Sequence, residues 1–456
     1  MDYLFSALFL ALNLFQYEVK MNKYLFLVLG AAVFIALFKF TFDRTKNFLT
    51  SCLIMMCYTW QSSWINIFGE PTSELQLPWY YIIGVIMVIY TLINVRHCFE
   101  RKFDGFAMAV FVAQLIWMNY PMIISETFSE GFKNYIMIAF FSVLVFICFL
   151  FHDEASEQNY NQYRNALIWS VFLASLGLIL QYTMYKAAGI SLFKIEIIPS
   201  FSGYQLGCQL LMEDHSSATI MFGVGAFYVM TKLDGKNWPY LASTLVVIIA
   251  AMAMTSRRTS TLTLVAMFAL FAIVNVRGLG KKIGFTALVI LLGGVMLFFL
   301  LKTRPVDSLA QLLNDNGRFL NFNDAANTIK AHPFGVGLDD YALALNYMPE
   351  SGIVPHNTFL RWLCIGGWPL GILMALAIGY CAVTALKKGL KGAFWGILYT
   401  VLASNFIPDI MCARFFVIIC SAAMLMPKYK KPEVTLKKPK KLKKKFTGNA
   451  ALRGES

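Results

Sequence analysis

The chain has 456 residues and a net charge of +14; 58% of its residues are hydrophobic and only 14% are charged. Soluble domains carry nearer ~25% charged residues, so too little charge is present to cover a water-facing surface. The composition indicates a polytopic α-helical membrane protein, excludes a secreted enzyme, a cytosolic dinucleotide-binding protein and a disordered chain, and disfavours a β-barrel because the apolar runs are continuous rather than alternating.

The predicted fold is all-α, with about fourteen transmembrane helices and one long loop outside the membrane. Each helix is predicted from an apolar run between charged or Pro- and Gly-rich breaks, since about 20 apolar residues span the hydrocarbon core. The first run is expected to be retained rather than cleaved, because the residues before it lack the basic region of a signal peptide. The predicted spans cover residues 3–17, 23–40, 47–68, 79–94, 105–124, 135–151, 167–187, 215–231, 239–254, 260–276, 284–302, 359–385, 393–408 and 414–427.

Lysine and arginine set the predicted orientation, because short basic loops stay in the cytoplasm. Three such loops, at 96–102, 277–282 and 387–391, lie on one side of the membrane if there are fourteen spans. Both termini are then cytoplasmic. The two long polar segments, 190–214 and 302–355, face the other side, and because the spans contain almost no ionisable residues, the chemistry is expected in these outer loops.

The domain prediction is a transmembrane catalytic domain over residues 1–427, whose long outer loop covers 303–357, followed by a basic cytoplasmic tail over 428–456. The tail holds eleven Lys or Arg against two Glu. It is suited to anionic lipids of the inner leaflet, and a topology anchor without a partner is an equal alternative. Nucleic acid is not a predicted partner.

Arg257 and Arg258 open a span on the outer side, next to Thr255, Ser256 and Ser260. Two guanidinium groups at the mouth of a membrane cavity can hold phosphate oxygens bidentately. The alternative is that both arginines extend to lipid headgroups. The functional interpretation is favoured because outer arginine pairs run against the positive-inside trend.

The long outer loop contributes Arg318, a helical stretch from Asp324 to Lys330, and a glycine-containing segment over residues 332–337. Arg318 could add a third cation to the same site. The glycines permit a tight turn, but a lone Gly-x-Gly with no strand before it indicates phosphate binding only weakly. Asp339 and Tyr341 follow this segment as further candidates.

His356 and Asn357 stand where the loop re-enters the membrane. A histidine at a helix start can accept a proton from an attacking hydroxyl. Alone, it would more often be a capping or structural residue, but its position on the same face as Arg257, Arg258 and Arg318 favours catalysis.

At these residues the sequence resembles the O-antigen ligase and O-antigen polymerase superfamily of bacterial envelope glycosyltransferases. Three elements match in order: Ser256-Arg257 opening a span; Arg318 followed by His-Pro-Phe-Gly-Val-Gly at 332–337; and His356-Asn357 before a Gly-rich span with Gly366, Gly367 and Gly371. The resemblance covers about residues 215–425.

The resemblance implies transfer of a glycan from a polyprenyl (undecaprenyl) diphosphate carrier to an acceptor hydroxyl at the periplasmic face of the bacterial inner membrane. His356 would be the base or acceptor-orienting group, and Arg257 and Arg318, with Arg258 on position alone, would hold the diphosphate. The acceptor would be a glycan or the lipid A core, and a chain-length regulator is a further implied partner. No metal and no cofactor is needed, and the sequence has no Asp-x-Asp motif that would hold a divalent ion.

Two departures from the family pattern are visible. The loop before the span at His215 offers only Lys194 as a basic residue, so Lys194 and His215 are further candidates. The run from Gly366 to Gly371 has a glycine spacing slightly different from that expected of a ligase, which favours an O-antigen or surface-polysaccharide polymerase. A ligase onto lipid A core stays open as the alternative.

Two alternatives of other kinds also stay open. A transporter or flippase of lipid-linked oligosaccharide would use the same cations without cutting the substrate, although neither repeated halves nor a polar central path is visible. A protein oligosaccharyltransferase ranks third, because the early outer loop at 69–74 lacks Asp-x-Asp.

Overall fold

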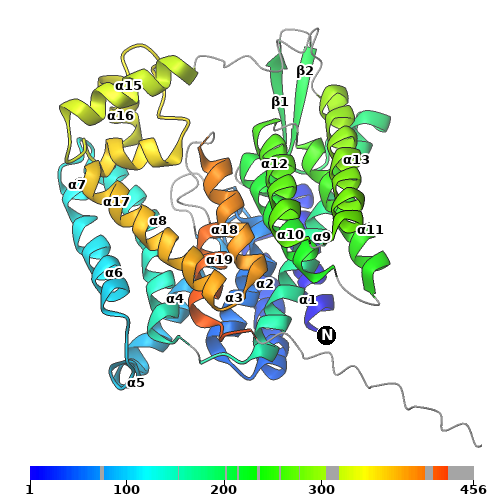
Figure 1. Ribbon diagram of the computed structural model, residues 1–456, viewed down its shortest axis with the longest axis horizontal. Coiled ribbons are helices and arrows are strands. Elements are labelled where there is room, and N and C mark those ends of the chain that lie inside the picture. Colours follow the sequence, from blue (N-terminus) through cyan, green and yellow to red (C-terminus); the bar gives the residue numbers. More distant parts are fainter. Residues whose placement is uncertain are drawn as a thin grey trace, which may run out of the picture.

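The protein is a bundle of helices that run between two ends, with one small sheet projecting from one of them (Figure 1). The all-α fold class predicted from composition is confirmed in its main feature, since most of the described chain is helical. The computed structural model describes residues 1–71, 77–152, 154–200, 203–212, 215–233, 237–255, 258–276, 278–303, 318–405 and 414–429.

The helices follow the apolar runs of the sequence closely. In chain order they are α1 Asp2–Val19, α2 Lys23–Thr45, α3 Phe48–Thr59, the 3₁₀ helix η1 Trp60–Ser62, α4 Trp79–Ile93, α5 Val95–Phe99, α6 Gly105–Trp117, α7 Asn119–Ile123, α8 Phe128–Leu150, α9 Glu157–Ala188, α10 His215–Lys232, α11 Trp238–Met254, α12 Arg258–Asn275, α13 Leu279–Thr303, α15 Arg318–Ala331, α16 Asp340–Tyr347, α17 Thr358–Lys387, α18 Lys391–Ser404 and α19 Arg414–Leu425.

Side-chain caps fix where many of these helices begin. Asn22 Oδ1 accepts a hydrogen bond from the Tyr24 N–H at 3.0 Å at the start of α2. Ser156 Oγ accepts one from the Asn159 N–H at 3.2 Å at the start of α9. Such residues satisfy N–H groups that have no partner inside the helix, so the short polar breaks between apolar runs become defined helix starts.

A β-hairpin lies within residues 190–214, which were predicted to form a long polar loop. Strand β1, Ile195–Ser200, pairs antiparallel with β2, Gly203–Cys208. The expectation missed it because β-branched Ile195, Ile197 and Ile198 favour a strand in a stretch too short and polar to count as a span. Buried Gln181 of α9 holds the base of the hairpin: its Nε2 donates to the carbonyls of residues 192 and 194 at 2.9 and 3.0 Å, and its Oε1 accepts from the N–H of residue 210 at 3.2 Å.

The number of transmembrane spans is where the structure departs most from the sequence prediction. Each of the fourteen predicted runs overlaps a helix. Within the described part of the chain, however, five helices are long and apolar enough to cross a membrane, and the prediction of fourteen is not confirmed. These five are Lys23–Thr45, Gly105–Ile123, Phe128–Leu150, Glu157–Ala188 and Thr358–Lys387.

Helix α3 explains why an apolar run need not be a span. It has 12 residues, so it is about 18 Å long at 1.5 Å per residue, short of the ~30 Å hydrocarbon core. Every residue from Leu49 to Thr59 is buried, and α10 is likewise buried from Ala218 to Met230. Neighbouring helices enclose both runs. Hydropathy alone does not distinguish an apolar run that is buried between helices from one that faces lipid.

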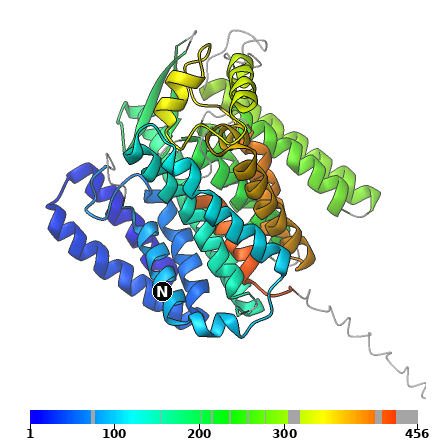
Figure 2. The ribbon, with the colours of Figure 1, turned by 90° about the vertical axis from the view of Figure 1, so that its left-hand side faces the viewer.

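Both ends of the described chain lie at one end of the bundle. Asp2 forms an ion pair with Arg44 at 2.7 Å, and the Arg44 carbonyl accepts a hydrogen bond from Gln162 on the first turns of α9. On the same turns the ring of Tyr160 contacts that of Tyr429, with centroids 5.6 Å apart. The hairpin, α15 and α16 lie at the opposite end, called the hairpin end below (Figures 1 and 2).

Two of the basic loops also gather at the end opposite the hairpin. Lys391 Nζ lies 3.5 Å from Asn275 Oδ1, which joins the start of α18 to the end of α12. Lys388 Nζ donates to the carbonyl of Met426 at 2.7 Å, beside the beginning of the basic tail. The structure thus brings these basic segments together, as the sequence analysis expected, and the side of the membrane that they face stays a prediction.

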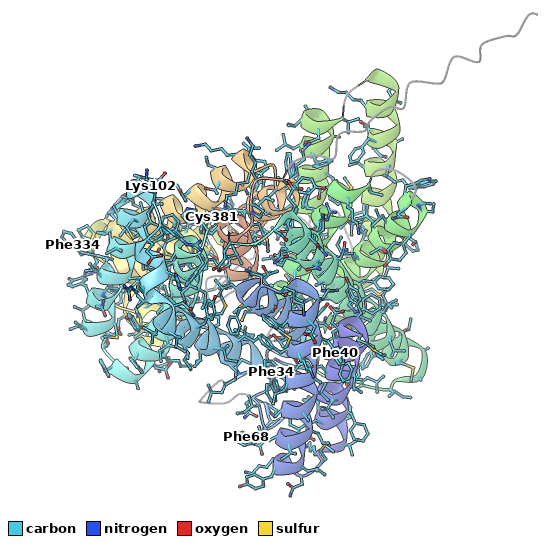
Figure 3. All side chains as sticks on the ribbon, turned by 90° about the horizontal axis from the view of Figure 1, so that it is seen from below. Phe34, Phe40, Phe68, Lys102, Phe334 and Cys381 are labelled. Carbon is cyan, nitrogen blue, oxygen red and sulfur yellow. The ribbon has the colours of Figure 1, made fainter. Side chains whose placement is uncertain are left out.

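Glycine and aromatic residues let the central helices pack closely. A Cβ on Gly223 of α10 would lie 2.2 Å from the ring of Tyr399, so glycine is needed for α18 to approach α10. Elsewhere aromatic rings fill the spaces, as where Phe34 of α2, seen from below in Figure 3, stacks on Trp79 with centroids 5.1 Å apart. The close contact of α10 with α18 matters for the site, because both helices reach the hairpin end.

Candidate functional site

His356 occupies a fixed position at the start of α17. Asn357 caps this helix, its Oδ1 accepting hydrogen bonds from the N–H groups of Phe359 and Leu360 at 2.9 and 3.1 Å. The backbone N–H of His356 donates to Asn321 Oδ1 at 2.8 Å, and the residue is half-buried. The prediction that this histidine stands at a helix start is confirmed, and its catalytic role stays a prediction.

Asn321 organises the approach to His356 from α15. It is fully buried, and its Nδ2 donates to the carbonyls of Ile353 and Val354 at 2.9 and 3.3 Å. It lies one turn after Arg318, the residue at which α15 begins. The structure therefore puts the first turn of α15 beside His356, although the side chain of Arg318 lies outside the described residues.

The same face of α15 continues to hold the returning loop. Asp324 Oδ2 accepts hydrogen bonds from the N–H groups of Glu350 and Ser351 at 3.1 and 2.8 Å. One turn further, Thr328 Oγ1 donates to the carbonyl of Tyr347 at 2.7 Å. Residues three, four and seven apart share a helix face, so α15 fixes the loop over most of its length. The sequence predicted a helical stretch from Asp324 to Lys330, and the helix extends this back to Arg318.

The glycine-containing segment before α16 pairs with a break in α17. At Gly367 the backbone leaves helical geometry (φ 69°, ψ −173°), two residues before Pro369. In a regular helix the carbonyls of residues 364 and 365 would accept from the N–H groups of residues 368 and 369. The N–H of Trp368 donates instead to the Pro333 carbonyl at 2.9 Å, and a proline has no N–H to offer.

The carbonyls of residues 364 and 365, left without helical partners by this break, accept hydrogen bonds from the glycine-containing segment. Val336 N–H donates to the Cys364 carbonyl at 2.9 Å, and Gly337 N–H donates to the Ile365 carbonyl at 3.1 Å. Glycine is required here, because a Cβ on Gly335 would lie 2.5 Å from the Ile365 oxygen. The phosphate-cradle interpretation of this segment is therefore not supported, since its N–H groups at 336 and 337 are used within the protein.

Asp339 and its neighbours have structural contacts that the sequence did not indicate. Asp339 caps α16 and accepts from the N–H groups of Ala342 and Thr127 at 3.0 and 3.1 Å. Burial alone would raise the pKa of its carboxyl, but these hydrogen bonds favour the ionised form and bring the pKa below its usual value. Tyr341 is 74% exposed. Neither residue is brought next to His356 by a described contact.

A second set of contacts joins the starts of α10 and α12. Thr219 Oγ1, one turn after His215, lies 2.7 Å from Thr255 Oγ1 in the turn that leads to α12. Tyr399 Oη of α18 donates to the carbonyl of Ser260 at 3.3 Å. Arg257 lies outside the described residues, as do the side chains of His215 and Arg258, but the residues around them meet at this point.

The end of α18 connects these two groups of elements. Asn357 Nδ2 donates to Asn405 Oδ1 at 3.2 Å, where Asn405 follows the last turn of α18. Tyr399, about one and a half turns earlier on α18, contacts α10 and α12. Candidates far apart in the sequence therefore gather at one end of the bundle. Asn321, which is buried, and Asn405, which is partly buried, belong to this arrangement and were missed. Their partners lie far away along the chain, so no local pattern indicates them.

Lys194 is placed against an aromatic ring. Its ammonium group lies 4.1 Å from the centroid of Trp64, in cation–π geometry. Trp64 in turn contacts Tyr17 at the end of α1, with ring centroids 5.7 Å apart. This candidate is thus tied to the α1 side of the hairpin end.

The comparisons with known proteins gave one match, to a family model. Residues 243–375 match the family model described as O-antigen ligase. The match contains Arg257, Arg258, Arg318 and His356, and it is shorter than the 215–425 region in which the resemblance was seen. Neither the curated proteins nor the solved structures gave a match. The resemblance to the O-antigen ligase superfamily is confirmed, and with the long apolar helices it indicates a multi-pass membrane enzyme that processes glycans.

Proposed function

We propose that this member of the O-antigen ligase superfamily is a membrane glycosyltransferase that moves a glycan from a polyprenyl diphosphate carrier to an acceptor hydroxyl, as a surface-polysaccharide polymerase. The observation that carries the proposal is the hydrogen bond from the His356 N–H to buried Asn321, 2.8 Å long. It holds the candidate base beside the helix turn that begins with Arg318. A base and a diphosphate-binding cation are the two groups that this reaction needs.

In the proposed reaction the acceptor oxygen attacks the anomeric carbon of the donor glycan. The bond from that carbon to the diphosphate oxygen breaks, and the diphosphate leaves on its lipid with the bonding electron pair. His356 takes the proton of the hydroxyl. Arg257 and Arg318, with Arg258, bind the diphosphate and stabilise the negative charge that develops on it, which is why the scheme uses no metal.

The proposed location is the bacterial inner membrane, with both termini in the cytoplasm and the hairpin end in the periplasm. The clustering of both chain ends and two basic loops at the other end supports this orientation, because basic loops stay cytoplasmic. His356 would then face the periplasm, where lipid-linked glycan and acceptor would both reach it.

The test is transfer by the purified protein in detergent, supplied with a polyprenyl diphosphate-linked repeat unit. We expect a ladder of longer glycans that His356→Ala and Arg318→Ala abolish. The matched control is His97→Ala, which removes an exposed imidazole at the opposite end of the bundle and should leave the ladder intact. If the wild type transfers no glycan while the lipid still binds, the enzyme proposal fails and transport of the lipid becomes the leading function. Normal turnover by His356→Ala would refute the role proposed for His356.

A ligase is the second candidate, because the matching family model is described as O-antigen ligase. The glycine spacing from Gly366 to Gly371 favours the polymerase instead. Adding lipid A core to the same reaction separates the two. One capped product without a ladder would identify a ligase, whereas a ladder that forms without the core would identify a polymerase.

A further inference from the structure

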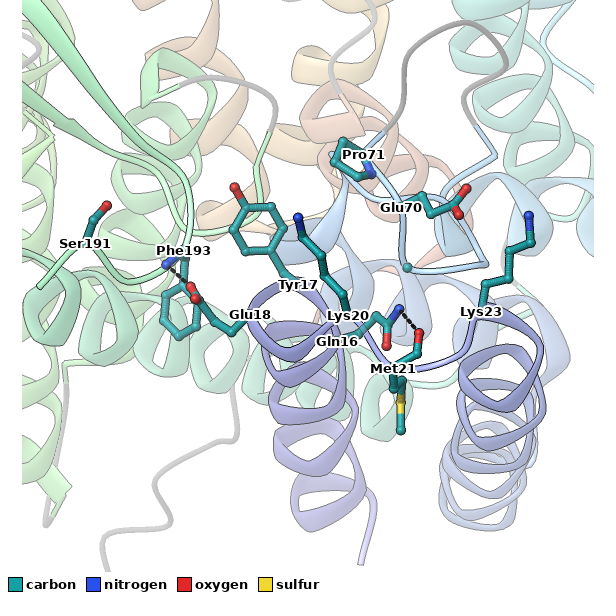
Figure 4. Close-up of a pocket in the computed structure, with 11 residues that line it drawn as sticks. Gln16, Tyr17, Glu18, Lys20, Met21, Lys23, Glu70, Pro71, Ser191 and Phe193 are labelled. Carbon is teal, nitrogen blue, oxygen red and sulfur yellow. Dashed lines mark hydrogen bonds between the residues drawn. The ribbon is translucent and has the colours of Figure 1, made fainter.

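A cavity of about 790 Å³ opens at the hairpin end, between the end of α1 and the start of α2. The turn at residues 69–71 and the segment at 191–193 close its other sides (Figure 4). Its lining residues are distinct from His356 and from the arginines of the proposed centre. The polar groups of this second cavity indicate what it binds.

Gln16 is the residue that points to a ligand. It is only 4% exposed, and its Nε2 donates to the Met21 carbonyl at 3.1 Å. Its Oε1 is buried and has no hydrogen-bond partner among the described residues. A buried acceptor left without a donor is costly, so the site is built for a molecule that brings one. Gly69 leaves room for the Gln16 side chain, because a Cβ at residue 69 would lie 2.2 Å from Gln16 Cγ.

The opposite wall of the cavity is held in a strained conformation. Phe193 has φ +58°, in the left-handed region that bulky residues rarely adopt. Its N–H donates to the carboxylate of Glu18, and Gln181 holds the carbonyls on both sides of it. Such strain persists where surrounding contacts impose it and is concentrated at functional sites. The wall is therefore shaped in advance of binding.

The charges and rings of the lining indicate the class of ligand. Two carboxylates, Glu18 and Glu70, stand with two ammonium groups, Lys20 and Lys23. This balance does not select a diphosphate, and the many polar side chains do not suit a lipid tail. A lining that contains both ammonium donors and carboxylate acceptors suits hydroxyl groups, which can donate and accept hydrogen bonds. The ring of Tyr17 offers an apolar face.

We propose that this cavity binds a saccharide segment of the glycan substrate, apart from the reacting end, with one sugar hydroxyl donating to Gln16 Oε1. The proposal rests on the proposed function for the identity of the glycan. The cavity and His356 would then hold two parts of one polymer at the same end of the bundle, so that occupation of the cavity would favour further addition to a bound chain.

The experiment is calorimetric titration of the full-length protein in detergent with oligosaccharides released from the surface polysaccharide of the producing strain. These probes carry neither lipid nor diphosphate. We expect Gln16→Met, which is nearly isosteric but has no acceptor oxygen, to weaken binding about tenfold, and Glu70→Gln at an exposed position to weaken it severalfold. Glu130→Gln, which alters an exposed carboxylate on α8 at the same end, should bind as the wild type does.

Binding and turnover separate the two proposals. If the wild type does not bind the oligosaccharide, or if Gln16→Met and Glu70→Gln both bind it equally well, the saccharide site is wrong whatever the turnover. Inorganic pyrophosphate is the second probe. If pyrophosphate displaces the oligosaccharide, and if Gln16→Met weakens pyrophosphate binding, the cavity binds anions and the saccharide proposal is wrong. Absence of glycan transfer by the wild type would overturn the proposed function while leaving the Gln16 binding result unaffected.

Discussion

Arg361 and Asp340 form an ion pair between α17 and α16, with Arg361 Nε 3.0 Å from Asp340 Oδ1. Arg361 is only 6% exposed. Asn134 of α8 donates a second hydrogen bond to the carboxylate of Asp340, from Nδ2 to Oδ2 at 3.4 Å. The pair lies one turn into α17, just after His356 and Asn357. It therefore ties three helices together at the base of the candidate site.

Breaking this ion pair should destabilise the protein strongly. We expect Arg361→Leu to cost roughly 2 kcal/mol, because it leaves the partly buried carboxylate of Asp340 without its cation. Arg361→Leu combined with Asp340→Leu should recover part of that loss. Thermal unfolding in detergent measures both. The control is Lys133→Leu, which breaks the exposed pair with Glu130 and should cost less than about 1 kcal/mol; equal losses from the two single variants would contradict the argument.

Asn321 should affect turnover more than substrate binding. Asn321→Ala removes the acceptor for the His356 N–H and the donors that hold residues 353 and 354. Because a displacement near 1 Å can cost about 10²-fold in rate, we expect kcat to fall by that order while donor-lipid binding persists. Asn321→Asp keeps the acceptor and should be intermediate.

The control for that experiment is Asn346→Ala, which removes an exposed amide bound to Glu126. It lies at the same end of the bundle but has no described contact with residues 351–356. A drop in kcat as large as that of Asn321→Ala would mean that general loosening of the loop, rather than the position of His356, limits the rate.

Gly367 should tolerate no side chain. Its backbone has φ +69° and a Cβ would lie 2.3 Å from the Phe334 carbonyl carbon. We expect Gly367→Ala to destabilise the protein by roughly 2 kcal/mol or more. Gly379→Ala on the same helix is the matched control, because nothing lies within 4 Å of its Cβ position. A thermal shift for Gly379→Ala as large as that for Gly367→Ala would refute the role assigned to the break in α17.

Asp339 should be a stability residue with a defined pH dependence. Its pKa is lowered in the folded protein, so its ionisation stabilises the fold above the unfolded value of about 3.9, and that contribution is lost as pH falls through the folded pKa. We expect Asp339→Ala to cost about 1 kcal/mol at neutral pH, with the difference shrinking below about pH 4. Unfolding curves at several pH values measure this.

Turnover provides the second readout for Asp339. The folded fraction of Asp339→Ala should retain near-normal activity at neutral pH, because the carboxylate caps α16 and binds the Thr127 N–H. Asp339→Asn, which keeps an acceptor oxygen, should lose less stability. If Asp339→Asn lost activity without losing stability, Asp339 would have a role in the reaction rather than in stability.

The features that could be predicted are those that depend on residues close together in the sequence. Apolar runs became helices because hydropathy and short polar breaks act locally, and Asn357 starts a helix because its side chain caps the next turn. His356 could therefore be placed at a helix start, and the resemblance to the O-antigen ligase superfamily could be seen in the motifs around it. The β-hairpin was missed because Ile195–Ser200 is too short for a periodic signal.

The contacts that hold the candidate site together were not predictable from a single sequence. Asn321 and His356 are 35 residues apart along the chain, and Asn357 meets Asn405 across 48 residues. Nothing in the local pattern pairs these amides. The count of fourteen spans is not confirmed for a related reason. Residues such as Leu53 in α3 are buried against other helices, and in the sequence such a buried apolar run looks the same as one that faces lipid.

The break in α17 has a consequence for the design of chimaeras. Residues 333–337 and 364–368 exchange three main-chain hydrogen bonds, with Gly335 and Gly367 in contact where they cross. A chimaera that grafts the outer loop of a relative onto this chain would separate the two halves of that pairing. The unit that should be exchanged is this segment together with the first turns of α17, so a chimaera with a relative is expected to fold only when residues 318–368 are exchanged as one block.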